Sequence, residues 1–328
     1  MRRAILKRGV RVLFDSRSVS VVFLYFSEVI KMERKPVFKG VATAMITPFT
    51  DTGAIDYESF GRFIEFQISG GVDALVVCGT TGEAAALSDA EHRDAISFVV
   101  ERVAGRVPVI AGTGSNDTAY SIELSRFACK AGADALLCVT PYYNKTTQRG
   151  LVRHFKTIAD SVDRPIILYN VPSRTGLNIE PSTYLELSEH PNIAGIKEAN
   201  GNIAKIVDTV ALLGNKLDLY SGNDDQTVPI LALGGMGVIS VISNILPAET
   251  AAICRRYFEG DTVGSLEMQL RLVPLINALF CEVNPIPVKA ACAAMGLCGE
   301  YLRLPLAEME DGHRATLLSE MRKQGLKV

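Results

Sequence analysis

The sequence has few of the residues that metal, disulfide and nucleic-acid sites require. Only four histidines occur in 328 residues, and none lies at the end of an expected strand. The seven cysteines are odd in number and form no C-x-x-C pair, which favours reduced core thiols in a cytoplasmic protein. Net charge is −2 with no basic block in the body of the chain, so no nucleic-acid partner is indicated. These absences favour a small soluble ligand, with no metal and no cofactor.

The first 31 residues differ from the rest in their charge. Arg and Lys outnumber Asp and Glu there, and a short apolar run covers residues 19–26. That run is too short to span a bilayer, and no A-x-A cleavage site follows it. Because Met32 directly precedes the first good strand, we expect residues 1–36 to be an extension that arises from a start codon placed too early. A genuine but dispensable extension is the alternative.

Beyond residue 36 the chain alternates between apolar strands and capped amphipathic helices. Short crossovers between near-continuously apolar strands predict a parallel sheet covered by helices. Eight such units favour a closed (β/α)8 TIM barrel of the α/β class over an open doubly wound sheet. The expected strands are 40–46, 74–78, 107–111, 135–139, 165–169, 193–196, 217–220 and 237–242. The expected helices are 56–69, 88–104, 117–131, 147–162, 181–189, 202–213, 225–233 and 247–259.

Three further helices are expected after the last strand, at 262–281, 286–295 and 313–324. No low-complexity linker separates them from the alternating region. The sequence therefore predicts a barrel over residues 37–260 and a C-terminal helical appendage over residues 261–328.

Lys197 ends an apolar strand, where an amine is costly unless chemistry needs it. A desolvated lysine loses its proton more readily and can attack a ketone to form a Schiff base. A surface lysine at a strand end is the ordinary alternative. Active sites of TIM barrels lie where the strands end. The other polar residues at those positions are Thr47, Thr80, Thr81, Tyr142, Tyr143, Tyr169, Arg174 and the Gly222-Asn223-Asp224 turn.

This set of an amine, phenols, hydroxyls and a guanidinium suits metal-free carbonyl chemistry. Backbone N–H groups over residues 80–82 could hold the carboxylate of an α-keto acid. Tyr169 is one strand away from Lys197, within reach for proton transfer, and Arg174 could clamp a second carboxylate. The acidic residues Glu83 and Glu198 fit salt bridges or caps better than a cation site. No Gly-rich loop follows the last strand, so a phosphate site is not predicted.

Six ordered segments carry a resemblance to a known family. They are 79–83 (GTTGE), 139–144 (VTPYYN), 169–176 (YNVPSRTG), 195–199 (GIKEA), 237–240 (GVIS) and 284–289 (NPIPVK). From residue 37 to near its C-terminus the chain resembles the 4-hydroxy-tetrahydrodipicolinate synthase (dihydrodipicolinate synthase) family. That family lies in the N-acetylneuraminate lyase superfamily of class I pyruvate aldolases. The resemblance implies a metal-independent lyase that condenses pyruvate with L-aspartate-4-semialdehyde in lysine and diaminopimelate synthesis.

The resemblance also implies roles for individual residues. Lys197 binds pyruvate as an imine, Thr81 and its neighbours hold the pyruvate carboxylate, and Arg174 binds the carboxylate of the semialdehyde. A proton relay is implied for Thr80, Tyr169 and Tyr143, with Tyr143 contributed by a neighbouring subunit of a tetramer built from two tight dimers. Two further substrate contacts are implied, Ile239 and Gly222.

Two alternatives and one departure accompany the resemblance. An aldolase for a sialic acid or a 2-keto-3-deoxy sugar acid would share Lys197 and Tyr169, but such members resemble each other in lacking Arg174. A catalytically silent regulatory barrel would usually lose its nucleophile or relay.

Lysine-inhibited members share a site that Asn116, Tyr142 and His92 match, but a histidine is replaced by Asp89 and an acid by Tyr120. We therefore expect weak feedback inhibition by lysine or none.

Overall fold

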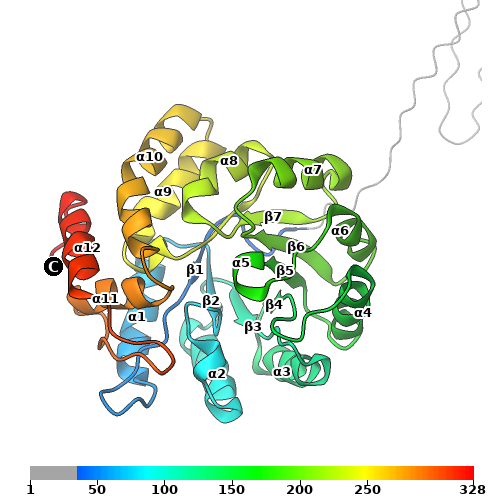
Figure 1. Cartoon of the computed structure of the whole chain (residues 1–328), viewed down its shortest axis with the longest axis horizontal. Helices are drawn as coiled ribbons and strands as arrows, with labels where there is room; N and C mark the ends of the chain where they lie inside the picture. The colour runs from blue at the N-terminus through cyan, green and yellow to red at the C-terminus, as the bar shows by residue number, and fades with distance from the viewer. Residues whose placement is uncertain (1–34) are drawn as a thin grey trace, which may run out of the picture. The chain divides into compact units, whose positions relative to one another are not determined.

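The computed structural model describes residues 35–328, and Pro36–Val328 is one compact unit. Eight parallel strands pair in sequence order and close into a barrel, with β1 beside β8. Figure 1 shows these strands ringed by helices. The predicted TIM barrel of the α/β class is confirmed. Its strands are β1 (Gly40–Ala44), β2 (Ala74–Val77), β3 (Val109–Gly112), β4 (Ala135–Val139), β5 (Ile166–Asn170), β6 (Ile193–Glu198), β7 (Asp218–Ser221) and β8 (Gly237–Ser240).

The helices on the outside of the barrel begin at polar capping residues. The side chains of Asp56, Ser88, Asp117, Thr147 and Asn202 each accept a hydrogen bond from a backbone N–H of the first turn. Such caps satisfy donors that have no partner inside the helix, which explains why the predicted starts agree closely with the observed ones. The main outer helices are α1 (Tyr57–Ser69), α2 (Asp89–Val103), α3 (Thr118–Ala131), α4 (Gln148–Ala159), α6 (Pro181–Leu187), α7 (Ile203–Leu213), α8 (Thr227–Ala232) and α9 (Pro247–Phe258).

Several short helical turns follow strands where loops or longer helices were expected. The expected helix 225–233 is divided between a 3₁₀ turn, η2 (Asp224–Gln226), and α8. The loop after β5 contains one helical turn, α5 (Pro172–Thr175), which starts at a proline. Two other 3₁₀ turns are η1 (Ala84–Ala86) and η3 (Ile242–Asn244). A single turn contains no repeat of the apolar pattern, so periodicity could not detect these elements.

The C-terminal helices are α10 (Thr262–Leu279), α11 (Ile286–Ala294) and α12 (Asp311–Lys323). They lie on one side of the barrel, where α10 contacts α9 and α12 contacts both α10 and α11 (Figure 1). No helix among residues 35–328 is long and apolar enough to cross a membrane. The seven cysteines all carry free thiols. Our expectation that residues 1–36 are an extension falls mainly on residues 1–34, which lie outside the described residues.

Strand residues alternate between two apolar layers. Ile167, Tyr169, Tyr220 and Ile239 belong to the cluster inside the barrel. Ile166 and Leu168, their neighbours on β5, belong to the larger layer between the strands and the helices. Side chains two residues apart on a strand share a face, so this alternation determines which polar strand residues can reach the barrel interior.

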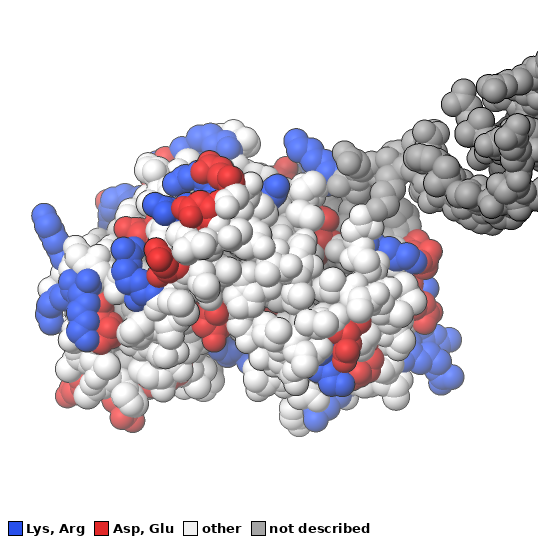
Figure 2. Space-filling model, turned by 90° about the horizontal axis from the view of Figure 1, so that it is seen from above, with Lys and Arg blue, Asp and Glu red and all other residues white. Residues whose placement is uncertain are grey.

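Charged side chains on the outside are mixed in sign. On the face drawn in Figure 2, Lys and Arg side chains are interspersed with Asp and Glu rather than gathered into one continuous basic surface. This face therefore presents no continuous basic surface that would indicate a polyanionic partner.

Candidate active site

Lys197 lies near the end of β6 and is buried, with 5% of its surface exposed. It is the register partner of Tyr169 on β5, and its Nζ lies 4.3 Å from the centroid of the Tyr169 ring. A cation on the face of an aromatic ring is attracted by the negative charge of that face. The strand pairing thus brings together the amine and the phenol that the sequence analysis selected.

The loop after β2 is a tight turn that holds Thr80 and Thr81 at the mouth of the barrel. Gly82 N donates to Gly79 O (3.1 Å), and Thr47 Oγ1 donates to Gly82 O (2.7 Å). A Cβ on Gly82 would lie 3.1 Å from Met45 O, so glycine permits this close approach. The Gly82 N–H is therefore committed to the turn, and the candidate substrate contacts of this loop are Thr80 and the buried Thr81.

A cavity of about 530 Å³ opens beside these residues. Its lining comes from the loops after β2, β3, β4 and β5, from α2 and α3 and from the C-terminal segment, and it includes Thr80, Tyr142, Tyr169, Arg174 and Asn284. Lys197 is not part of the lining, but it contacts the ring of Tyr169, which does line the cavity. The cavity is large enough for two small organic acids beside a buried amine.

Arg174 lies on α5 and is mostly exposed. Its Nη2 donates to the backbone oxygen of Asn284 (3.1 Å), and the Asn284 side chain donates through Nδ2 to Thr81 Oγ1 (3.0 Å). Asn284 therefore connects the guanidinium to the loop after β2. Sequence reasoning did not select Asn284 as a functional residue, although it begins one of the six matching segments.

Tyr143 does not meet the other candidates within this chain. Its side chain is 92% exposed, and its backbone has φ of 65°, a left-handed conformation that is uncommon for a tyrosine. The adjacent Tyr142 is 37% exposed and lines the cavity. A large aromatic ring held away from its own chain is available for contact with another molecule.

Gly222 directly follows β7 and Ile239 lies on β8, and neither residue lines the cavity. Gly222 N donates to Glu198 O (2.7 Å), and a Cβ at position 222 would lie 2.7 Å from the Cβ of Ala199. Ile239 is fully buried in the interior cluster that contains Tyr169. Ile239 thus contributes to the barrel interior, whereas Gly222 packs against the end of β6 and the residue after it.

The acidic residues near the site have structural partners. Glu83 forms a buried ion pair with Lys289 of α11. Asp224 Oδ2 accepts hydrogen bonds from the backbone N–H groups of Val241 (3.0 Å) and Ile242 (2.9 Å). Burial raises the pKa of Asp224, whereas these hydrogen bonds and the charge of Lys197 act in the opposite direction. The ion pair agrees with the salt bridge expected for Glu83, whereas Asp224 holds the backbone after β8.

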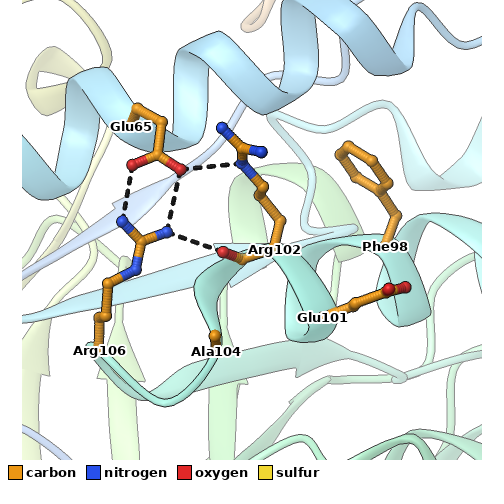
Figure 3. Close-up of a pocket in the computed structure, with 6 residues that line it drawn as sticks. All are labelled: Glu65, Phe98, Glu101, Arg102, Ala104 and Arg106. Carbon is orange, nitrogen blue, oxygen red and sulfur yellow. Dashed lines mark hydrogen bonds and ion pairs between the residues drawn. The ribbon is translucent and has the colours of Figure 1, made fainter.

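A larger hollow of about 810 Å³ lies on the outer surface between α1 and α2. Figure 3 shows the Glu65 carboxylate there, held by Arg102 and Arg106, with Phe98 and Glu101 alongside. The Arg102 contact is 2.8 Å and the Arg106 contact is 2.6 Å. The lining contains no lysine, cysteine, serine or histidine, and the Glu65 carboxylate is neutralised by two guanidinium groups, so we take the strand ends as the candidate active site.

Known proteins resemble this chain over nearly its whole described length. The dihydrodipicolinate synthetase family matches residues 37–324. The 4-hydroxy-tetrahydrodipicolinate synthase of Thermoanaerobacter pseudethanolicus is 54% identical over 89% of this chain and 98% of that protein. The protein of the same name from Caldicellulosiruptor saccharolyticus is 53% identical over 89% of this chain and 99% of the relative. The crystal structure of dihydrodipicolinate synthase from Aquifex aeolicus superposes with a TM-score of 0.87 at 46% identity, covering 89% and 99% of the two chains. The chain belongs to the dihydrodipicolinate synthetase family.

Proposed function

We propose that this chain condenses pyruvate with L-aspartate-4-semialdehyde to give 4-hydroxy-tetrahydrodipicolinate, the first step of the diaminopimelate and lysine branch. The observation that carries the proposal is the buried Lys197 amine against the Tyr169 ring, beside a cavity lined by hydroxyls and a guanidinium. The names of the relatives support the same reaction. The chemistry needs no metal and no organic cofactor, because the amine itself activates the ketone.

In the proposed mechanism, neutral Lys197 Nζ attacks the ketone carbon of pyruvate. The resulting carbinolamine loses its hydroxyl as water and becomes an imine. Loss of a methyl proton then gives an enamine, whose carbon attacks the aldehyde of the second substrate. The amino group of the semialdehyde attacks the imine carbon, closes the ring and releases Lys197 as the free amine. Each proton transfer needs a group within hydrogen-bond reach, and the Tyr169 phenol is the candidate beside the amine.

Two carboxylates must be held during these steps. We assign the pyruvate carboxylate to Thr80 and Thr81, since Thr80 lines the same cavity as Tyr169 and the buried hydroxyl of Thr81, in the loop after β2, is held by Asn284. Arg174 is assigned to the carboxylate of the semialdehyde, because a guanidinium binds a carboxylate through two parallel hydrogen bonds. Ile239 and Gly222 are assigned to the shape of the pyruvate pocket.

We further propose that Tyr143 completes the relay of Thr80 and Tyr169 in a neighbouring copy of the chain. Its 92% exposure in one chain supports this assignment, since the phenol projects away from its own site. The assembly proposed is a homotetramer of two tight dimers that acts in the cytoplasm. An Arg174→Ala variant and a Tyr143→Phe variant should then show different defects, in semialdehyde binding and in proton transfer respectively.

Borohydride trapping tests the central assignment. Reduction in the presence of pyruvate should inactivate the enzyme and leave a three-carbon adduct on Lys197, which peptide mapping locates. Lys289 is the matched control, because it is also buried but is paired with Glu83. An adduct on Lys289 would refute the assignment of Lys197.

Turnover separates the proposal from its alternatives. Pyruvate with aspartate semialdehyde should be consumed much faster than sialic acid or 2-keto-3-deoxygluconate is cleaved. Faster cleavage of either sugar acid would favour an aldolase for that substrate. Absence of both turnover and a trapped imine would favour a silent barrel.

A further inference from the structure

A second pair of polar residues follows the catalytic pair on the same two strands. In the register of β5 and β6, Tyr169 faces Lys197, and the next pair is Asn170 with Glu198. Tyr169 belongs to the barrel interior, so the next residues point to the opposite side, toward the outer helices. Asn170 and Glu198 are 0% and 2% exposed. A carboxyl group is thus buried directly behind the catalytic amine.

The Glu198 carboxyl group is the acceptor in each hydrogen bond that it forms with the described residues. Asn170 Nδ2 donates to Oε1 (3.0 Å) and lies 3.2 Å from Oε2. The backbone N–H of Asn200 donates to Oε1 (2.9 Å), and the Tyr184 hydroxyl of α6 donates to Oε2 (3.0 Å). An ionised carboxylate accepts all three, whereas a protonated carboxyl group brings a donor of its own.

The orientation of Asn170 is fixed by its other contacts. Its Oδ1 accepts from the backbone N–H of Ile179 (3.1 Å), and its Nδ2 also donates to Asn178 Oδ1 (2.8 Å). Asn178 in turn donates through Nδ2 to Glu180 Oε1 (3.1 Å). Asn170 therefore cannot turn its amide oxygen toward Glu198 without breaking two hydrogen bonds.

Burial raises the pKa of Glu198 to about 7, although the hydrogen bonds from Asn170, Asn200 and Tyr184 oppose this rise. The titratable groups around it are Tyr184 and Glu180 at α6, and Lys197 on the other face of β6. Burial raises the pKa of Tyr184 well above its usual value, so its phenol stays protonated and remains a donor. Glu198 therefore changes its charge near neutral pH.

We propose that ionised Glu198 is a positioning residue that holds Lys197 and Tyr169 in register by binding Asn170 across β5 and β6. The proposal rests on the proposed function, because Lys197 must be the amine that forms the imine. Protonation of Glu198 removes its negative charge, and because a neutral carboxyl oxygen is a weaker acceptor than a carboxylate, the cross-strand contact to Asn170 weakens. The amine then departs from the geometry needed for attack on the ketone, which reduces the rate of imine formation.

Glu198→Gln tests this inference with a side chain of nearly the same shape. Its amide group brings a donor into the same cluster, so it mimics the protonated state. We expect kcat and the rate of borohydride-trapped imine formation at pH 8 to fall about tenfold, with the KM for aspartate semialdehyde nearly unchanged. The inflection of kcat near pH 7 should also disappear from the pH profile of this variant.

Tyr184→Phe provides a second measurement that does not remove the charge. Loss of one donor to the carboxylate should raise the pKa of Glu198, which moves the acid limb of the kcat profile to higher pH. A purely structural role would lower thermal stability without moving this limb. Glu186→Gln on α6 is the matched control, because Glu186 is exposed and bonds only Lys156 at 3.5 Å among the described residues; its profile should equal that of the wild type.

The outcomes separate this inference from the proposed function. A wild-type enzyme that traps no pyruvate on Lys197 would overturn the proposed function itself. Trapping in the wild type with an unchanged rate and pH profile in Glu198→Gln would overturn only the positioning role. If Glu198→Gln fails to fold, Tyr184→Phe decides, and an acid limb that does not move would overturn the inference.

Discussion

Replacing Lys289 with methionine should destabilise the fold far more than a typical single substitution. Lys289 lies on α11, and its ion pair with Glu83 joins the C-terminal helices to the loop that carries Thr80 and Thr81. The side chains of Lys289 and Glu83 are 0% and 1% exposed. Burial lowers the pKa of Lys289, while the charge of Glu83 acts in the opposite direction. The variant would leave the Glu83 carboxylate without its cation.

The magnitude follows from the partners that remain. Methionine keeps the contact with the Phe49 ring, which lies 4.1 Å from Lys289 Nζ, so little packing is lost. Glu83 Oε2 still accepts the backbone N–H of Arg303 (3.1 Å). Removing one partner of a buried ion pair costs about 3–5 kcal/mol. For a chain of this length, that corresponds to a fall in Tm of roughly 4–8 °C.

Circular dichroism during urea or thermal unfolding measures this change, since the chain contains no tryptophan to report by fluorescence. The double variant Lys289→Met with Glu83→Gln removes both charges, and the glutamine oxygen can still accept from Arg303. It should be more stable than Lys289→Met alone by about 2 kcal/mol. A loss below about 1 kcal/mol in Lys289→Met, or no recovery in the double variant, would refute the reasoning.

Three other predictions concern substrate, acid and lysine. Arg174→Ala should leave imine formation nearly intact and raise the KM for aspartate semialdehyde by a factor that corresponds to about 1.5–3 kcal/mol of lost hydrogen-bond free energy. An equal rise in the KM for both substrates would contradict the assigned role. Burial lowers the pKa of His154 to about 4, so the free energy of unfolding should fall by up to about 3 kcal/mol as pH falls from about 6.5 through 4. In His154→Gln, acid unfolding should show a weaker dependence of this free energy on pH. Millimolar L-lysine should inhibit turnover weakly or not at all, because Tyr120 offers only a neutral acceptor and Asp89 already pairs with Arg93 (2.8 Å). Strong inhibition of the wild type would contradict this prediction. If strong inhibition persisted in Asp89→Ala, Asp89 would be excluded as its cause.

The barrel could be predicted because its signals are local. Apolar strands, capped helices and short crossovers repeat eight times, and each unit restricts the next to a right-handed parallel arrangement. Single-turn elements such as α5 were not predicted, because Pro172 starts a helix that ends at Gly176 after only one turn. In that helix the first residue and the cap, rather than apolar periodicity, fix the structure.

The candidate site could be predicted in part for the same reason. Lys197 and Tyr169 lie near the ends of strands, Thr80 and Arg174 lie in the segments that follow strands, and the barrel topology alone directs strand ends to one mouth. Asn284 gave no such signal, because it belongs to a segment after α10 that reaches Thr81 only through the tertiary fold. A contact between residues this far apart in sequence has no periodic signature.

Glu198 shows how the two faces of one strand divide a function. Sequence reasoning assigned it to a salt bridge or cap because it directly follows Lys197, but consecutive strand residues point to opposite sides of the sheet. The carboxyl group is thereby separated from the substrate side and surrounded by donors from Asn170, Asn200 and Tyr184. In the positioning role proposed above, a charge placed there holds the strand that carries the amine without contacting the amine. That separation of support from chemistry explains why a buried acid and a buried lysine can be adjacent in sequence at a site where the amine must react as a neutral group.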